Sequence, residues 1–150
     1  MNAIRLESYN EVYLEKSWHW LNDPEIKCLT NTRSFTKDDQ QKWFHALAGR
    51  SDYKLWGVSY NAIPIGVFGI KNIENGSGEY WGYIGEKEYW GKGLGPVIIG
   101  AIIDQAKQLN LKRLYLKVIG ENVRAIKLYR KMGFQFSSKE EGLMVFTKQL

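Results

Sequence analysis

The segment that most restricts the fold is Trp90-Gly91-Lys92-Gly93-Leu94-Gly95-Pro96, in which glycines occupy three alternate positions. It follows residues 79–85, whose aromatic-rich composition predicts a strand, and precedes residues 96–109, where apolar residues recur at helical spacing. A strand, a glycine turn and a helix in succession are typical of α/β proteins. Alternate glycines also let backbone amides point inward. With Lys92 and the helix N-terminus, they predict a phosphate-binding loop, the alternative being a glycine turn that binds nothing.

The order of the remaining elements predicts one domain, residues 1–150, with a mixed α/β sheet. Asn61-Ala62 and Asn75-Gly76 are turn signals, so residues 54–85 are expected to form an antiparallel meander. Ser8 and Glu11 fit a capping box, which predicts a helix from there to about Leu21. The other expected helices are a short turn at Pro24, residues 36–48 and residues 122–132; the other expected strands are residues 3–7, 113–119, 134–136 and 143–148. The order β-α-α-β-β-β-α-β-α-β-β places helices on both faces.

Charge and composition exclude several function classes. Residues 1–75 hold nine Lys/Arg and nine Asp/Glu, whereas residues 76–150 hold twelve and seven, so the net charge of +5 lies in the second half. That half suits an anionic ligand, either nucleic acid or a phosphorylated cofactor, and solvated surface lysines are the alternative. One cysteine, Cys28, and two histidines are too few for a disulfide or a metal site, so no metal is expected. The sequence has no apolar run long enough to span a membrane and no signal-peptide pattern, so we expect a cytoplasmic protein without a membrane partner.

Two motifs lie in the second half of the chain. Residues 88–95 follow the strand Tyr80–Ile84, and residues 122–134 read Asn-Val-Arg-Ala-Ile-Lys-Leu-Tyr-Arg-Lys-Met-Gly-Phe. They resemble the acetyl-CoA pyrophosphate loop Gln/Arg-x-x-Gly-x-Gly/Ala and the Asn-x-x-Ala-x-x-x-Tyr-x-x-x-Gly-Phe motif of the GNAT N-acetyltransferases, and the resemblance covers essentially the whole chain. The first loop position is Trp90, a departure that recurs in the branch of ribosomal-protein alanine acetyltransferases and bacterial amino-sugar acetyltransferases. The resemblance implies the GNAT fold with a splayed central sheet.

The same resemblance implies direct transfer of an acetyl group from acetyl-CoA to an amine, without a covalent enzyme intermediate and without a metal. It places Tyr129 beside the thioester sulfur as hydrogen-bond donor or general acid, a role that suits a phenol protonated at neutral pH. Relatives that carry a glutamate base have it where this chain has Lys117, so Glu79 is the candidate base, alone or through water. Gly82 and Gly85 would permit a bulge that frees an amide near Ile84 for the thioester carbonyl. The expected cofactor-binding residues are Ile84, Trp90, Gly91, Lys92, Gly93, Leu94, Gly95, Asn122 and Lys131. For Asn122 a plain helix N-cap is the alternative.

The acceptor must be inferred from the first half, which is neutral overall and rich in tryptophan and phenylalanine. Aromatic walls suit a sugar ring or a base, and no acidic pocket for a polyamine is evident. Our first hypothesis is therefore a nucleotide-linked amino-deoxysugar, and the alternative is a protein N-terminus. Hypotheses from another class are a nucleic-acid-binding module, which scattered lysines and the lack of an RNA-binding motif disfavour, and an inactive CoA-binding sensor. We expect a monomer or homodimer that acts on a small-molecule amine, with no nucleic-acid partner.

Overall fold

The computed structural model describes residues 3–150 and confirms the mixed α/β fold class. Its helices are α1 (Glu11–Asn22), α2 (Pro24–Leu29), α3 (Lys37–Leu47), the 3-10 turn η1 (Lys87–Tyr89), α4 (Leu94–Gln108) and α5 (Val123–Lys131). Its strands are β1 (Ile4–Ser8), β2 (Lys54–Tyr60), β3 (Ile63–Glu74), β4 (Ser77–Ile84), β5 (Arg113–Val118), β6 (Gln135–Glu140) and β7 (Leu143–Gln149). The order follows the sequence prediction, with the turn at Pro24 extended into a helix of its own.

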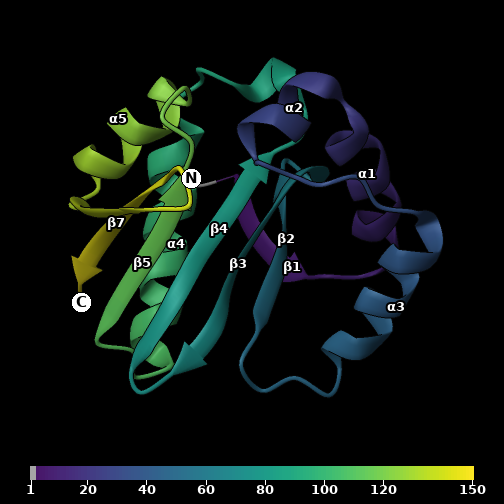
Figure 1. Ribbon diagram of the computed structural model, residues 1–150. Helices are drawn as coiled ribbons and strands as arrows, with labels where there is room; N and C mark the ends of the chain where they lie inside the picture. Colours follow the sequence, from purple (N-terminus) through teal and green to yellow (C-terminus); the bar gives the residue numbers. More distant parts are fainter. Residues whose placement is uncertain (1–2) are drawn as a thin grey trace.

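One seven-stranded sheet, in the order β1-β2-β3-β4-β5-β7-β6, forms the centre of the molecule (Figure 1). Every neighbouring pair is antiparallel except β4 and β5, which run parallel. Those two strands pair only from Ser77↔Arg113 to Glu79↔Tyr115 and then diverge, as Figure 1 shows. The predicted splay of the central sheet is therefore present, and it opens toward the carboxyl end of β4.

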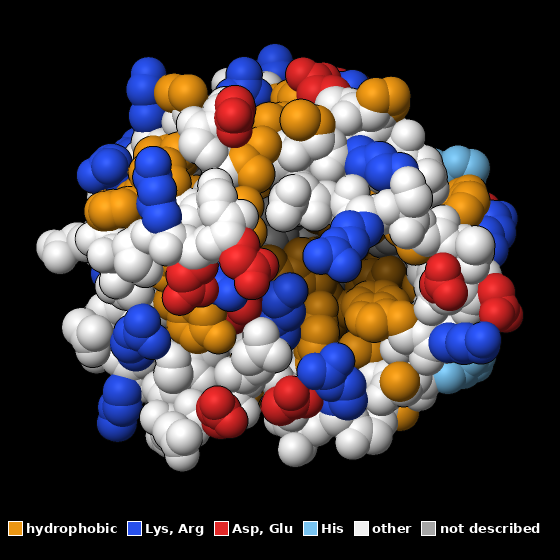
Figure 2. Space-filling model, viewed as in Figure 1, with side chains coloured by type: hydrophobic (Ala, Val, Ile, Leu, Met, Phe, Trp, Pro, Cys, Tyr) orange, Lys and Arg blue, Asp and Glu red, His pale blue; other side chains and the backbone are white. Residues whose placement is uncertain are grey.

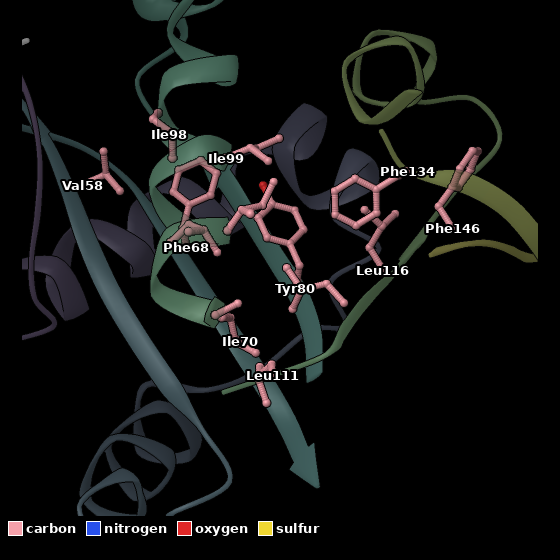
Figure 3. Packing of buried hydrophobic residues seen from close by; sticks show 14 of the residues in the cluster. Val58, Phe68, Ile70, Tyr80, Ile98, Ile99, Leu111, Leu116, Phe134 and Phe146 are labelled. Carbon is pink, nitrogen blue, oxygen red and sulfur yellow. The ribbon is translucent and has the colours of Figure 1, made fainter. Parts of the chain in front are cut away.

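The larger core lies between the sheet and α4 (Figure 3). Ile98, Ile99 and Ile102 of α4 are fully buried against side chains of β3 and β4, including Phe68 and Tyr80. Residues of α5 pack against the same cluster, so α4 and α5 cover one face. A smaller cluster joins α1 and α2 to the opposite face through residues such as Tyr13 and Tyr83. Within residues 3–150, no helix combines the length and apolar character that crossing a bilayer requires.

The predicted start of the first helix is wrong by two residues. Ser8 lies in β1, where it pairs with Trp56, and the N-cap of α1 is Asn10, whose side chain accepts hydrogen bonds from the amides of Val12 and Tyr13. Pairing with β2 holds Ser8 extended, so the capping box cannot form there. In the first turn of α1, Val12 is 56% exposed and Tyr13 is buried.

The bulge expected between Gly82 and Gly85 is absent from the β4 ladder. Pairing with β3 continues without interruption from Lys71↔Glu79 to Gly66↔Ile84. Just beyond the strand, the amides of Gly85 and Glu86 both donate to the carbonyl of Ile65, the hydrogen-bond pattern of a bulge that begins at Gly85. The two glycines instead admit large rings: a Cβ on Gly82 would lie 2.1 Å from the Phe68 ring, and one on Gly85 2.1 Å from Trp20.

Candidate active site

The glycine loop between β4 and α4 forms an open, electropositive nest. Gly91 and Gly93 have φ of 70° and 76°, the left-handed conformation that glycine adopts without strain. A Cβ at either position would meet no atom within 4 Å, so the loop faces open space. Gly93 is the N-cap of α4 and offers no capping side chain, which leaves the first amides of the helix free for an anion. The loop and the start of the helix at Leu94 have the form that a pyrophosphate requires.

Trp90 has a structural position that the sequence did not reveal. Its Nε1 donates to the carbonyl of Ile84 at 2.8 Å, which ties the loop to the end of β4. Two cations lie over its ring, Lys87 at 5.9 Å and Arg124 of α5 at 5.6 Å from the centroid. The exposed side chain of Lys92, in contrast, stands free in solvent at the loop. Trp90 therefore fixes the loop and presents one face to α5.

Gly95 packs α4 against α5. A Cβ added there would lie 2.7 Å from Cδ2 of Leu128, so only glycine allows this approach. Because Leu128 directly precedes Tyr129, the close packing at Gly95 also sets the distance of Tyr129 from the sheet. The glycine thus positions the helix, while its amide lies in the first turn of α4.

The splay exposes backbone amides of β4. The Gly85 amide donates to Ile65, so amides at odd-numbered positions of β4 face β3 and those of Gly82 and Ile84 face the other way. On that side β5 has already diverged, because pairing with it ends at Glu79. The Ile84 amide therefore faces into the opening between β4 and β5, where its predicted contact with a carbonyl oxygen is geometrically possible without a bulge.

Tyr129 lies on the α5 side of the same opening. Its ring makes an edge contact with Tyr80 of β4, with centroids 5.9 Å apart, and a tilted contact with Phe134 at 6.1 Å. Burial raises the pKa of Tyr129 to about 12, and a hydrogen bond with the Tyr80 hydroxyl acts in the opposite direction. The Tyr129 hydroxyl is therefore protonated throughout the physiological range, as a proton donor requires.

Glu79 is buried at the point where β4 and β5 part. It is 8% exposed, and its Oε1 accepts a hydrogen bond from Asn72 Nδ2 at 3.1 Å. Burial raises the pKa of Tyr115, and the charge of Glu79 raises it further. The hydrogen bond to Glu140 raises the pKa of Lys117, and the charge of Glu79 again adds to the effect. Three to five residues separate Glu79 from the amides of Gly82 and Ile84, roughly 10–16 Å along a strand. A proton taken up by Glu79 from an amine near Ile84 must therefore travel through water.

Asn122 and Lys131, the remaining predicted cofactor-binding residues, lie at opposite ends of α5. Asn122 is the N-cap: its Oδ1 accepts from the Ala125 amide at 3.3 Å, and its Nδ2 donates to the Leu29 carbonyl at 3.4 Å. Asn122 is therefore a helix N-cap, the alternative given in the sequence analysis, and its side chain also connects α5 to α2. Lys131 is an exposed side chain in the last turn of α5, about 13 Å along the helix from Asn122. The structure therefore does not bring Lys131 together with the glycine loop.

A cavity of about 280 Å³ lies on the opposite face of β4, between the sheet and the helices α1 and α3. Figure 2 shows the hollow with hydrophobic walls and with Lys and Arg side chains beside its mouth. Its aromatic walls are Tyr9, Phe35, Trp43, Trp81 and Tyr83. The sequence shows the aromatic excess but does not predict this cavity, since its aromatic walls come from four separate segments: before α1, between α2 and α3, in α3 and in β4.

The polar groups of the cavity are mostly hydroxyls. The Tyr9 hydroxyl donates to Ser17 Oγ at 3.2 Å, and burial raises the pKa of Tyr9 to about 12. Burial raises the pKa of Tyr83, and the neighbouring Ser17 hydroxyl acts in the opposite direction, although the Tyr83 hydroxyl makes no hydrogen bond of normal length within residues 3–150. Asp39 is the one carboxylate among the described lining residues, and it also accepts a hydrogen bond from the Thr36 amide. The described residues contain no cluster of three or more His, Cys, Asp or Glu suited to a metal ion.

Comparison with known proteins identifies this arrangement. The model of the acetyltransferase (GNAT) family matches residues 14–134, a span that includes the glycine loop, the splayed strands and Tyr129. The chain belongs to the GNAT acetyltransferase family. As a GNAT enzyme it is an N-acetyltransferase that uses acetyl-CoA, and the open glycine nest fits the diphosphate of that cofactor.

Relatives and solved structures agree with this assignment. A probable spermine N(1)-acetyltransferase of Bacillus subtilis subsp. natto (strain BEST195) is 36% identical over 108 residues, covering 65% of this chain and 71% of the relative. The spermidine N-acetyltransferase of Vibrio cholerae, solved with CoA and spermine, superposes with a TM-score of 0.87 at 20% identity over 99% and 95% of the two chains. Campylobacter jejuni N-acetyltransferase PseH superposes with a TM-score of 0.76 at 22% identity over 98% of each. At these identities the two structures show the shared fold.

Proposed function

We propose that this GNAT enzyme transfers the acetyl group to the primary amine of a nucleotide-linked amino-deoxysugar. The observation that carries the proposal is the aromatic cavity on the face of β4 opposite α4. Trp43 and Trp81 give flat apolar walls for a sugar ring. The cavity volume of about 280 Å³ lies near the lower end of the ~300–1,000 Å³ typical of ligand pockets, so it holds one ring. The nucleotide then lies outside, where cations stand beside the mouth (Figure 2).

A polyamine is the second candidate, supported by the relatives that are named for spermine acetylation. A polyamine carries several ammonium groups, each of which needs a carboxylate or an aromatic face when it is desolvated. The cavity offers aromatic faces but one carboxylate, Asp39, which already accepts the Thr36 amide. This charge balance favours the amino sugar. A protein N-terminus, the substrate of the ribosomal-protein branch, is the third acceptor to compare.

The proposed chemistry divides the proton transfers between the two faces of β4. Acetyl-CoA supplies the acetyl group as a thioester. Tyr129 donates a proton or hydrogen bond to the departing sulfur, and the Ile84 amide binds the thioester oxygen. Glu79 accepts the amine proton through water, because its distance along β4 forbids direct contact. The glycine loop holds the diphosphate and Trp90 fixes the loop to β4, so that the reacting groups meet at the opening of the sheet.

Acceptor assays test the proposal. Release of CoA thiol should be fastest with a nucleotide-linked amino sugar and slower with spermine, spermidine or N-terminal peptides. Trp43→Ala should raise KM for the sugar about tenfold or more without changing the Kd of CoA, because one wall is lost. Asp39→Asn should leave that KM within about twofold, since a neutral acceptor ring needs no carboxylate. Faster turnover of spermine, together with a large effect of Asp39→Asn on its KM, would replace the sugar by a polyamine.

Glu79→Gln should lower the rate at neutral pH by about one to two orders of magnitude, because the amine proton loses its acceptor. Raising the pH deprotonates the amine in solution and should restore much of the loss. The measurement is the pH–rate profile of both enzymes with the same acceptor. Asn72→Ala, which removes the partner of Glu79 and keeps the carboxylate, should change the rate much less. If the two pH profiles have the same shape, the proton leaves by another route.

A further inference from the structure

We propose that Arg124 supplies the polar side chain that the first position of the glycine loop lacks and binds the diphosphate of acetyl-CoA. The loop pattern of the family begins with Gln or Arg, whereas this chain has Trp90 there. Indole Nε1 has a single proton, and Trp90 donates it to the Ile84 carbonyl. Trp90 therefore cannot take the place of that polar residue. The inference depends on the use of acetyl-CoA and is independent of the acceptor.

The position of Arg124 follows from its contact with Trp90. Its guanidinium carbon lies 5.6 Å from the centroid of the Trp90 ring, within the range of a cation–π interaction. Trp90 is in turn fixed to β4, and Gly91 follows it directly. Arg124 is thus held, from the first turn of α5, against the first residue of the loop.

The charges around Arg124 indicate an anionic ligand. Lys87 lies over the same ring but is neutralised by Asp23 and Glu25, each 2.9 Å from its Nζ. Arg124 makes no ion pair with any carboxylate in residues 3–150. It lies instead over Trp90, the first residue of the loop that leads to the uncapped N-terminus of α4, whose dipole is also positive at that end. The Arg124 guanidinium and the positive end of the α4 dipole repel each other, and a diphosphate bound between them would be attracted to both.

Guanidinium chemistry suits this position better than an ammonium would. The planar group stacks on the indole and keeps its N–H donors in a fork that matches two phosphate oxygens. The stacking contact also restricts the side chain before the ligand arrives, which lowers the entropy lost on binding. Arg124 consequently acts as a cofactor-binding residue that reaches the loop from the neighbouring helix.

Calorimetric measurement of CoA binding tests the proposal without relying on turnover. Arg124→Gln should raise the Kd of CoA about 10- to 100-fold, the effect of losing a charge-assisted hydrogen-bond pair. The Kd of CoA for Arg124→Lys should lie between that of the wild type and that of Arg124→Gln. The matched control is Arg130→Gln on the same helix, where the guanidinium lies over Phe146 at 5.2 Å. The Kd of CoA for Arg130→Gln should remain within about twofold of the wild-type value. Thermal unfolding midpoints establish that all variants fold.

Two shortened ligands identify the phosphate group involved. Dephospho-CoA lacks the 3′-phosphate and should lose as much affinity on Arg124→Gln as CoA does. Pantetheine lacks every phosphate, and its weaker binding should be unchanged by the substitution. An unchanged Kd for CoA, an equal loss in Arg130→Gln, or a loss that disappears with dephospho-CoA would each overturn the assignment to the diphosphate.

Discussion

Gly93→Asp should weaken CoA binding by roughly 10²–10³-fold while the protein remains folded. No atom lies within 4 Å of a Cβ at this position, and aspartate tolerates positive φ better than most residues, so the fold should accept the side chain. The carboxylate would then occupy the space in front of the α4 amides, next to the diphosphate. Two like charges about 4 Å apart repel by about 4 kcal/mol at an effective dielectric constant of 20. Titration of CoA by calorimetry measures the loss.

Two control variants separate charge from backbone strain in this experiment. Gly93→Asn has the same size and the same φ of 76° without the charge, so it should bind CoA distinctly more tightly than Gly93→Asp. Gly142→Asp places the same side chain at φ of 82°, also in open space, in the turn between β6 and β7. It should leave the Kd of CoA unchanged. If Gly93→Asp binds CoA with the affinity of the wild type, the loop does not hold the diphosphate.

The local elements of this fold are predictable because their signals are local. Asn61, Asn75 and Gly76 adopt positive φ at the turns of the meander, as these residue types favour, and β2 spans residues 54–60 as expected. The start of α1 is not predictable in this way. Ser8 fits a capping box by spacing, but its pairing with Trp56 depends on a strand about fifty residues away. Long-range pairing thus decided a boundary that the local pattern assigned differently.

The site shows the same limit. The glycine loop and Tyr129 lie in motifs that a single sequence displays, and the structure places both at the opening between β4 and β5. On this helix the sequence predicts Lys131 and not Arg124, because the relevance of Arg124 depends on the packing of α5 against Trp90. Its place at the N-terminal end of α5, two residues after the cap Asn122, is the one signal that could have indicated it. Glu79 was chosen by its place on the strand, but only the ladder shows its distance from Ile84.

Tyr129→Phe should lower kcat by roughly 10²–10⁴-fold and change the Kd of CoA little, because general acid catalysis is lost while the ring contacts with Tyr80 and Phe134 remain. Steady-state turnover, with CoA binding measured separately, distinguishes the two effects. The wild-type pH profile provides a further check. Since burial raises the pKa of Tyr129 to about 12, its ionisation should not reduce activity at any pH well below that value. An alkaline decline near the ordinary phenol pKa of about 10 would assign the decline to another group.

Tyr80→Phe is the matched control, because it removes the hydroxyl that hydrogen-bonds to Tyr129 and leaves the proposed donor in place. Its turnover should fall far less than that of Tyr129→Phe, with the Kd of CoA again unchanged. The comparison matters because Tyr80 is buried in the core, whereas Tyr129 lies at the edge of the opening, so a purely structural role would make the Tyr80 variant the more damaged one. Wild-type kcat in Tyr129→Phe would show that the sulfur leaves without help from this hydroxyl. Equal losses in both variants would instead indicate that packing between β4 and α5, rather than proton donation, is what catalysis requires.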